Sequence, residues 1–217
     1  MASFVAHLSK DLKELIKKIG ETKSKQEEDR IIIDQLATLK GRLAEKNLTP
    51  KQIKEHLIRA LYIEMLGHSA PFAHIHAINL TQNKNLVLKR IGYLMCSLFF
   101  DKNSDLLIML VATILKDLTN GDVHEIVICL TSLGNIMNAT IAASITEHVV
   151  KLLNHTTDLV RKKATLVLQK IKQETGTAVA DYKDKMKKAL CDREPSVMAA
   201  SLNLYLEEVT ENPRKYR

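Results

Sequence analysis

The sequence is poor in the residues that interrupt helices. Its 217 residues include seven glycines, four prolines, no tryptophan and only 4% aromatic residues. Leu, Ile, Val and Ala therefore supply most of the 46% apolar content, which is ordinary for a packed protein. Because short strands joined by tight turns need more glycine and proline than this, we expect an all-α fold.

Long apolar runs are also missing. No stretch of 18 or more residues is both apolar and uncharged, which argues against a transmembrane helix. The first stretch, "MASFVAHLSKDLKEL", reaches Asp11 before the apolar core of a signal peptide could form. We therefore expect the chain to remain in the cytosol.

Patterns for disulfides, metal sites and catalysis are lacking as well. The three cysteines, Cys96, Cys129 and Cys191, are widely spaced in apolar helical surroundings, so we expect buried thiols rather than disulfides or a zinc site. His74 and His76 would point about 200° apart on a helix and could not share a metal. No nucleophile–histidine–acid arrangement and no glycine-rich phosphate loop occurs. We expect neither a cofactor nor enzyme activity.

Positive charge is in moderate excess. The chain has 32 basic and 25 acidic residues, a net charge of +7, and the excess is greatest between residues 161 and 193. Such a segment is usually a solvated helix surface, although it can also attract nucleic acid or anionic lipid. The residues that follow the repeated apolar marker described below form no base-reading code, and few aromatic residues accompany the lysines, so we expect no nucleic-acid partner.

A repeat of 37 residues organises most of the chain. Polar breaks at 81–85, 119–122, 154–158 and 191–196 are each followed directly by an apolar marker residue. The four markers are Leu86, Val123, Val160 and Val197. A second apolar stretch lies between successive markers, which gives two helices per period, the pattern of HEAT and armadillo solenoids. The sequence predicts an all-α, HEAT/armadillo-like α-solenoid of antiparallel helix pairs.

Helix signals divide the chain further. Ser24 with Glu27 has the form of a capping box, and Thr49 with Pro50 is a typical helix start. We expect three leading helices within residues 9–66, helical repeats over residues 71–210, and a single structural region over residues 1–217. The last helix has apolar residues on adjoining faces and no polar outer face, so we expect a longer array or a covering chain there.

The segment "KNLVLKRIGYLMCSLFFD" at 84–101 holds two cations in an apolar helix. Val87, Ile91, Leu94 and Leu98 form one helical stripe, which we expect to be buried, with the first repeat out of step by one residue. Lys89 and Arg90 then point elsewhere. The segment alone leaves open whether that direction is solvent, a structural partner or a functional surface such as a membrane.

Several long blocks of the sequence resemble the start of the large adaptin subunits of heterotetrameric adaptor protein complexes. The blocks are "YIEMLGHSAPFAHIHAINL" at 62–80, "KRIGYLMCSLFFD" at 89–101, "VATILKDL" at 111–118, "LVRKKATLVLQKI" at 159–171 and "ALCDREPSVMAASLNLYL" at 189–206. Among the large subunits, the blocks "KALCDREPSVMAASL", "EMLGH" and "HIHAINL" are most similar to the epsilon class of adaptor protein complex 4.

The resemblance implies a function that periodicity could not supply. It implies a scaffold subunit of a cytosolic vesicle-coat adaptor complex that also contains sigma, beta and mu subunits. Such a complex is recruited to trans-Golgi membranes by a GTP-bound Arf-family GTPase, sorts cargo into coated vesicles, and uses this part of the large subunit to hold the small sigma subunit. The alternative is a HEAT-repeat module in nuclear transport or RNA association.

The resemblance also suggests candidate contact residues. Ile75, Ile78 and Met109 match positions that offer apolar side chains to the GTPase in related large subunits, although each could equally be ordinary core. The lysine cluster that binds phosphoinositide in the endocytic relative is reduced here to Ile53, Lys54 and Glu55. The candidates for a general attraction to a membrane or other anionic surface are Lys51, Lys54, Arg59, Lys89 and Arg90.

Overall fold

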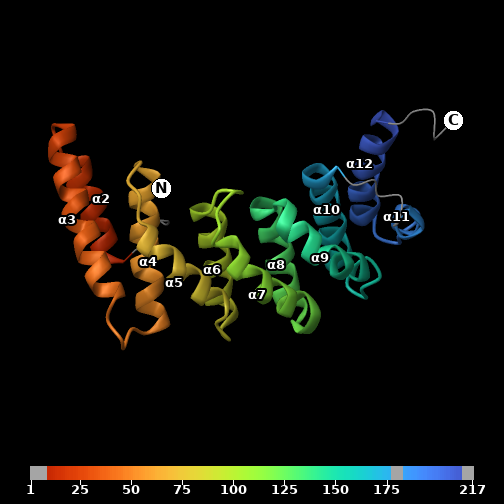
Figure 1. Ribbon diagram of the computed structural model, residues 1–217, viewed down its shortest axis with the longest axis horizontal. Coiled ribbons are helices and arrows are strands. Elements are labelled where there is room, and N and C mark those ends of the chain that lie inside the picture. The colour runs from red at the N-terminus through yellow and green to blue at the C-terminus, as the bar shows by residue number, and fades with distance from the viewer. Residues whose placement is uncertain (1–8, 177–182, 212–217) are drawn as a thin grey trace. The chain divides into compact units, whose positions relative to one another are not determined.

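The computed structural model describes residues 9–176 and 183–211. Eleven helices and no strand are present in these residues, so the predicted all-α class is confirmed (Figure 1). The chain divides into two compact units, Met1–Phe99 and Phe100–Arg217. None of the described helices is both long enough and apolar enough to cross a bilayer.

The first unit is a stack of helices in which each helix packs on its next two neighbours. Helix α3 packs against α4 and α5, α4 packs against α5 and α6, and α5 packs against α6, while α2 lies on α3. This is the packing of consecutive helix pairs in a solenoid. The helices are α2 (Lys10–Gly20), α3 (Lys25–Leu43), α4 (Pro50–Met65), α5 (Pro71–Thr81) and α6 (Leu86–Phe99).

The second unit follows the same pattern. Within it α7 packs against α8 and α9, α10 packs against α8, α9 and α12, and α11 packs against α12. The pairs α7/α8, α9/α10 and α11/α12 are therefore three successive repeats, as the 37-residue period predicted. The helices are α7 (Leu107–Asn120), α8 (Val123–Ile136), α9 (Ala139–Leu152), α10 (Asp158–Thr175), α11 (Lys183–Leu190) and α12 (Pro195–Glu211).

Most predicted helix starts are present. The side chain of Ser24 accepts from the N–H of Glu27, and Thr49 forms a complete capping box with Gln52 directly before Pro50. These contacts satisfy N–H groups that have no partner inside the helix. Helix α10 differs, because it begins at Asp158 and Thr157 in the cap position makes no side-chain capping hydrogen bond.

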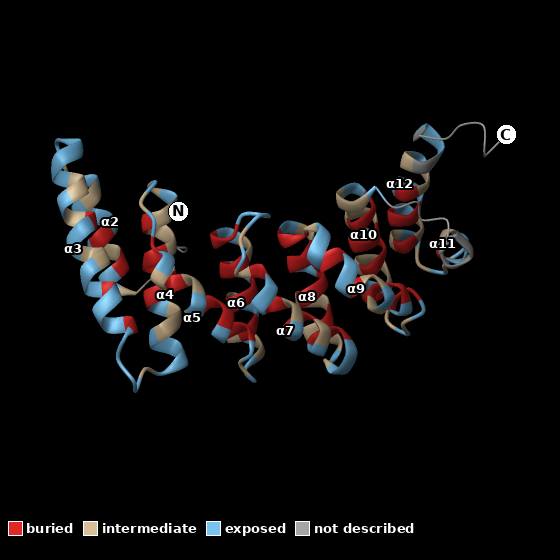
Figure 2. Cartoon of the chain, in the orientation of Figure 1, coloured by how far each residue is buried: buried red, intermediate tan, exposed pale blue. Residues whose placement is uncertain are grey.

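The core follows the repeat (Figure 2). The residues seven positions after the four markers are all buried, and they are Tyr93, Leu130, Val167 and Leu204. Positions i and i+7 share a helical face, so this stripe forms the inner side of α6, α8, α10 and α12. The repeat register therefore holds in all four repeats, and the expectation that the first repeat is out of step by one residue was wrong.

The predicted stripe on α6 was wrong. Val87, Leu94 and Leu98 are exposed, whereas Lys89, Tyr93 and Cys96 are buried. Gly92 provides a physical reason, because an ideal Cβ at this position would lie 2.6 Å from the backbone nitrogen of Thr81. The missing side chain lets α6 approach the end of α5 through this face. The apolar stripe that the sequence placed inside consequently points outward.

Candidate protein-interaction surface

The outward stripe of α6 is the clearest candidate for an interaction surface. Val87, Leu94 and Leu98 are 66%, 51% and 55% exposed, and Ile91 beside them is half-buried. We refer to these four residues as the α6 stripe. They follow one another at i, i+4, i+7 and i+11, so they form a continuous apolar band along three turns of the helix.

Such a band is costly to leave in water. Full burial of one large aliphatic side chain is worth about 1.5–3 kcal/mol, and contiguous exposed apolar surface marks interaction sites more often than isolated exposed residues do. Arg90 is exposed on α6 close to the stripe in sequence and supplies a charge at its border. This composition suits a partner protein better than a polar ligand.

The three apolar candidates for the GTPase contact differ in their exposure to solvent. Ile75 on α5 and Met109 on α7 are exposed. Ile78 is only 1% exposed, because it lies on the inner face of α5 with Ala77. Ile78 therefore belongs to the core, and its assignment as a surface contact is corrected. Ile75 belongs to the first unit and Met109 to the second.

Two of the five cationic candidates are not surface residues. Arg59 is 3% exposed, and its Nη1 lies 3.2 Å from Oδ2 of Asp11. Lys89 is also buried, which supports the structural interpretation of this lysine over the membrane-facing one. Lys51 and Arg90 are exposed and Lys54 is partly exposed, so these three remain available to an anionic surface.

The basic segment at 161–193 provides less free charge than its sequence suggests. Arg161 is used in an ion pair with Asp192, and Lys172 is buried. The side chains of Lys183 and Lys185 lie outside the described residues. Within the described part, Lys187, Lys188 and Arg193 are the exposed cations around the end of α11.

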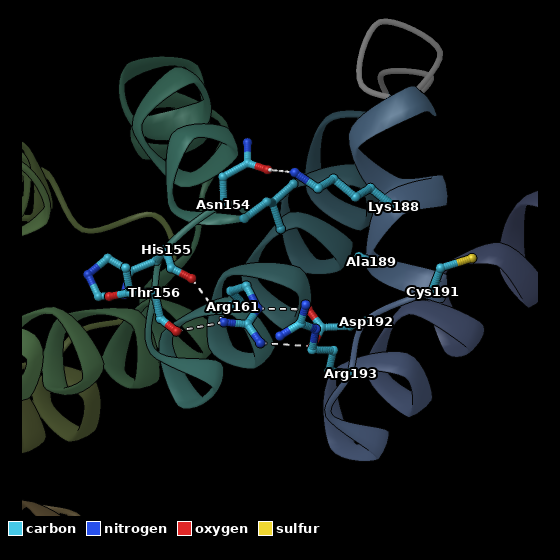
Figure 3. A pocket seen from close by; sticks show the side chains of 10 residues that line it. Asn154, His155, Thr156, Arg161, Lys188, Ala189, Cys191, Asp192 and Arg193 are labelled. Carbon is cyan, nitrogen blue, oxygen red and sulfur yellow. Dashed lines mark hydrogen bonds and ion pairs between the residues drawn. The ribbon is translucent and has the colours of Figure 1, made fainter.

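A pocket of about 410 Å³ opens in this segment of the second unit (Figure 3). It lies between the α9–α10 connection and the turn that joins α11 to α12. Lys188 donates to Oδ1 of Asn154 at 3.2 Å, and Arg161, which also lines the pocket, donates to Asp192. The ring of His155 and the Sγ of Cys191 point away from the centre of the pocket in this view. Its polar groups mainly join neighbouring repeats to one another.

The expectation of three buried thiols is met at two of the three cysteines. All three cysteines are free, and Cys96 and Cys129 are buried, but Cys191 is exposed at the pocket edge. Burial raises the pKa of the Cys96 thiol to about 12. No group of three or more His, Cys, Asp or Glu side chains in the described residues is arranged to hold a metal ion.

Sequence reasoning missed the α6 stripe as a surface because α6 is apolar on both sides. The signal that could have found it was the seven-residue spacing from Leu86 to Tyr93, which matches the other repeats. Gly92, adjacent to Tyr93, was a second signal, since a glycine inside an apolar helix often marks close backbone approach. Both place the inner face of α6 on the side opposite the stripe.

Comparison with known protein families identifies relatives across almost the whole sequence. Residues 28–217 match the family described as the adaptin N terminal region. The chain is 38% identical to the AP-4 complex subunit epsilon of Arabidopsis thaliana over 209 residues, which cover 96% of this chain and 22% of the relative. It is also 38% identical to the human AP-4 complex subunit epsilon-1 over 216 residues, which cover 100% of this chain and 19% of the relative.

A structural comparison gives the same result. The chain matches a homology model of the full-length AP-3 complex in an intermediate open conformation, with a TM-score of 0.66 and 29% identity. The match covers 77% of this chain and 30% of the other. The chain spans about one fifth of the length of the curated relatives it matches.

Proposed function

Because the chain belongs to the adaptin family, through its N-terminal region, we propose that residues 1–217 act as the N-terminal part of the trunk of a scaffold subunit in a vesicle-coat adaptor complex. The relatives are named as subunits of AP complexes, which supports a role in binding other subunits. The observation that carries the proposal is the α6 stripe. A band of exposed aliphatic side chains on a stable helix suits a permanent subunit contact.

The small sigma-type subunit is the proposed partner for the α6 stripe. In such a contact, the exposed aliphatic side chains of Val87, Leu94 and Leu98 would be buried against an apolar surface and removed from water. Arg90 at the border suits the polar rim of such an interface. The beta and mu subunits complete the proposed heterotetramer.

An Arf-family GTPase in its GTP-bound form is the proposed recruiting partner. The exposed side chains of Ile75 and Met109 are the apolar contact candidates, and Ile78 no longer belongs to this set. Lys51, Lys54 and Arg90 could each add about 1 kcal/mol of attraction close to an anionic membrane. The proposed location is cytoplasmic, peripheral on the trans-Golgi network and on coated vesicles.

The proposed role is one of binding, without catalysis, a cofactor or a nucleic-acid partner. It accounts for the use of charged side chains such as Arg161 and Asp192 in contacts between repeats. It also agrees with solenoids serving as extended binding scaffolds.

Co-expression and pull-down test the proposal. The chain should co-purify with an AP-4 sigma-type subunit, and the pair should retain an Arf-family GTPase loaded with a non-hydrolysable GTP analogue more strongly than the GDP form. Leu94→Asp should remove the sigma contact, whereas Ile33→Asp, at an even more exposed aliphatic residue on α3, should not. Failure to retain either partner would refute the scaffold role. Salt-sensitive binding to RNA in a gel-shift titration would favour the alternative HEAT-repeat module.

A further inference from the structure

A partly buried polar cluster connects the first three described helices. Asp11 on α2 places Oδ2 3.3 Å from Nη1 of Arg42 on α3 and 3.2 Å from Nη1 of Arg59 on α4. The Asp11 side chain is half exposed, whereas the Arg59 side chain is almost fully buried. One carboxylate on α2 therefore bridges cations from two other helices.

His56 on α4 is the fourth member of the cluster. Its Nδ1 lies 2.5 Å from Nη2 of Arg59, one turn further along α4, and both side chains are buried. A guanidinium group can only donate, so the short contact requires Nδ1 of His56 to accept and to carry no proton. A proton on this nitrogen would place two donors and two positive charges against each other in a site shielded from water.

The groups that face His56 come from three helices. They are Asp11 on α2, Arg42 on α3, and Arg59 and Glu55 on α4. Burial lowers the pKa of His56 most, and the positive charges of Arg59 and Arg42 lower it further against the smaller opposing effects of Glu55 and Asp11. The neutral imidazole is thus favoured by the same residues that hold Asp11.

Helix α2 buries little apolar surface of its own. Its 11 residues bury only two side chains, Leu12 and Leu15, and among the other helices its principal contact is with α3. A helix with so little buried surface is expected to open locally before the rest of its unit. The ion pair between Asp11 and Arg59 is a polar contact that links α2 to α4.

We propose that Asp11, Arg42, His56 and Arg59 form a proton-sensitive latch, in which protonation of His56 displaces the Arg59 guanidinium and releases α2 from α3 and α4. This inference is independent of the proposed scaffold function. The direction follows from linkage. At pH values above 6.5, the ordinary pKa of histidine, His56 is neutral and α2 stays fully attached. As the pH falls from 6.5 toward the lower pKa of His56 in the folded state, the attachment of α2 weakens.

Hydrogen exchange of the 217-residue chain tests the latch. After correction for intrinsic exchange rates, amide protection in α2 should fall between about pH 7.5 and pH 5, by up to about tenfold per pH unit, while protection in the core of α10 changes less. His56→Gln cannot take up the proton, so it should remove the pH dependence of α2. His76→Gln is the matched control, because His76 is a partly buried histidine on α5 outside the cluster, and its loss should leave that dependence in place.

Asp11→Asn provides a second variant. It should lower α2 protection at both pH values, because the charge that holds Arg59 is removed at any pH. A constant α2 protection in the unmodified chain across this pH range would overturn the proposal without relying on any variant. Retention of the full pH dependence in His56→Gln would overturn it as well, since another group would then be responsible.

Discussion

Arg161 on α10 holds the carboxylate of Asp192 with two parallel hydrogen bonds, from Nε at 2.7 Å and from Nη2 at 2.8 Å. The remaining Nη1 donates to the backbone carbonyls of His155 and Thr156, both at 2.9 Å (Figure 3). The guanidinium therefore fastens the α9–α10 connection and the α11–α12 turn to one another. Bidentate charge-assisted bonds of this kind are stronger than single ones and fix orientation.

Arg161→Lys should destabilise the second unit. A lysine keeps the charge but cannot reproduce the planar pair of bonds or reach the two carbonyls together. We expect a loss of about 1–3 kcal/mol in the free energy of unfolding, measured by urea denaturation. Lys25→Ala, which removes surface ion pairs with Glu28 and Asp29, should change the unfolding free energy by no measurable amount. An Arg161→Lys chain as stable as the unmodified one would contradict this role.

The same pair predicts an acid dependence. The hydrogen bonds from Arg161 hold the pKa of the Asp192 carboxyl below its ordinary value of 3.8. A depressed pKa means that the stabilising contribution is present above that value and is lost as the pH falls through the lower pKa of the folded state. Asp192→Asn should therefore flatten the stability profile below about pH 4. Equal slopes for the two proteins in this range would show that the pair is not coupled to folding.

Gly92→Ala should destabilise the first unit. The added methyl group would meet the backbone of Leu80 and Thr81 at 2.7 Å and 2.6 Å, so α6 would have to move away from α5. We expect a cost of about 1–3 kcal/mol in urea unfolding. Gly41→Ala on α3 is the control, because no atom lies within 4 Å of its Cβ, and alanine should there raise helix stability by up to about 1 kcal/mol. Equal effects at the two glycines would argue against the close approach.

The three thiols should differ sharply in reactivity. Cys191 is exposed and should react with a maleimide in the native chain, whereas Cys96 and Cys129 are buried. The pKa of Cys96, raised to about 12 by burial, leaves almost no thiolate at neutral pH. Mass spectrometry should find one modified cysteine before unfolding and three in denaturant. Rapid native labelling of Cys96 would show that the inner face of α6 is accessible.

The fold was predictable because the repeat has a clear physical origin. Each helix pair must bury one face against the next, so apolar residues recur at the same place in each period, as Leu130, Val167 and Leu204 do. The orientation of α6 was not predictable from its own apolar pattern, since both of its faces are apolar. The choice between the two faces depends on the close contact of Gly92 with α5, which the periodic pattern does not reveal.

Less of the candidate site than of the fold was predictable from the sequence. A lysine or arginine in an amphipathic sequence is usually solvated, yet Arg59 and Lys89 are buried. The burial of Arg59 depends on Asp11, which lies 48 positions earlier in the chain and on another helix. Ile78 and Ile75 have the same side chain, three residues apart, and only the packing of α5 decides that the first is core and the second is surface.

Accessibility of the α6 stripe in the assembled complex tests the central claim most directly. Leu94→Cys, in a chain that also carries Cys191→Ser, can be labelled with a maleimide alone and after assembly with the sigma-type subunit, with Ile33→Cys as the reference. The account predicts that assembly slows labelling at position 94 by at least about tenfold and leaves position 33 unchanged. Equal labelling at position 94 with and without the bound subunit would contradict it.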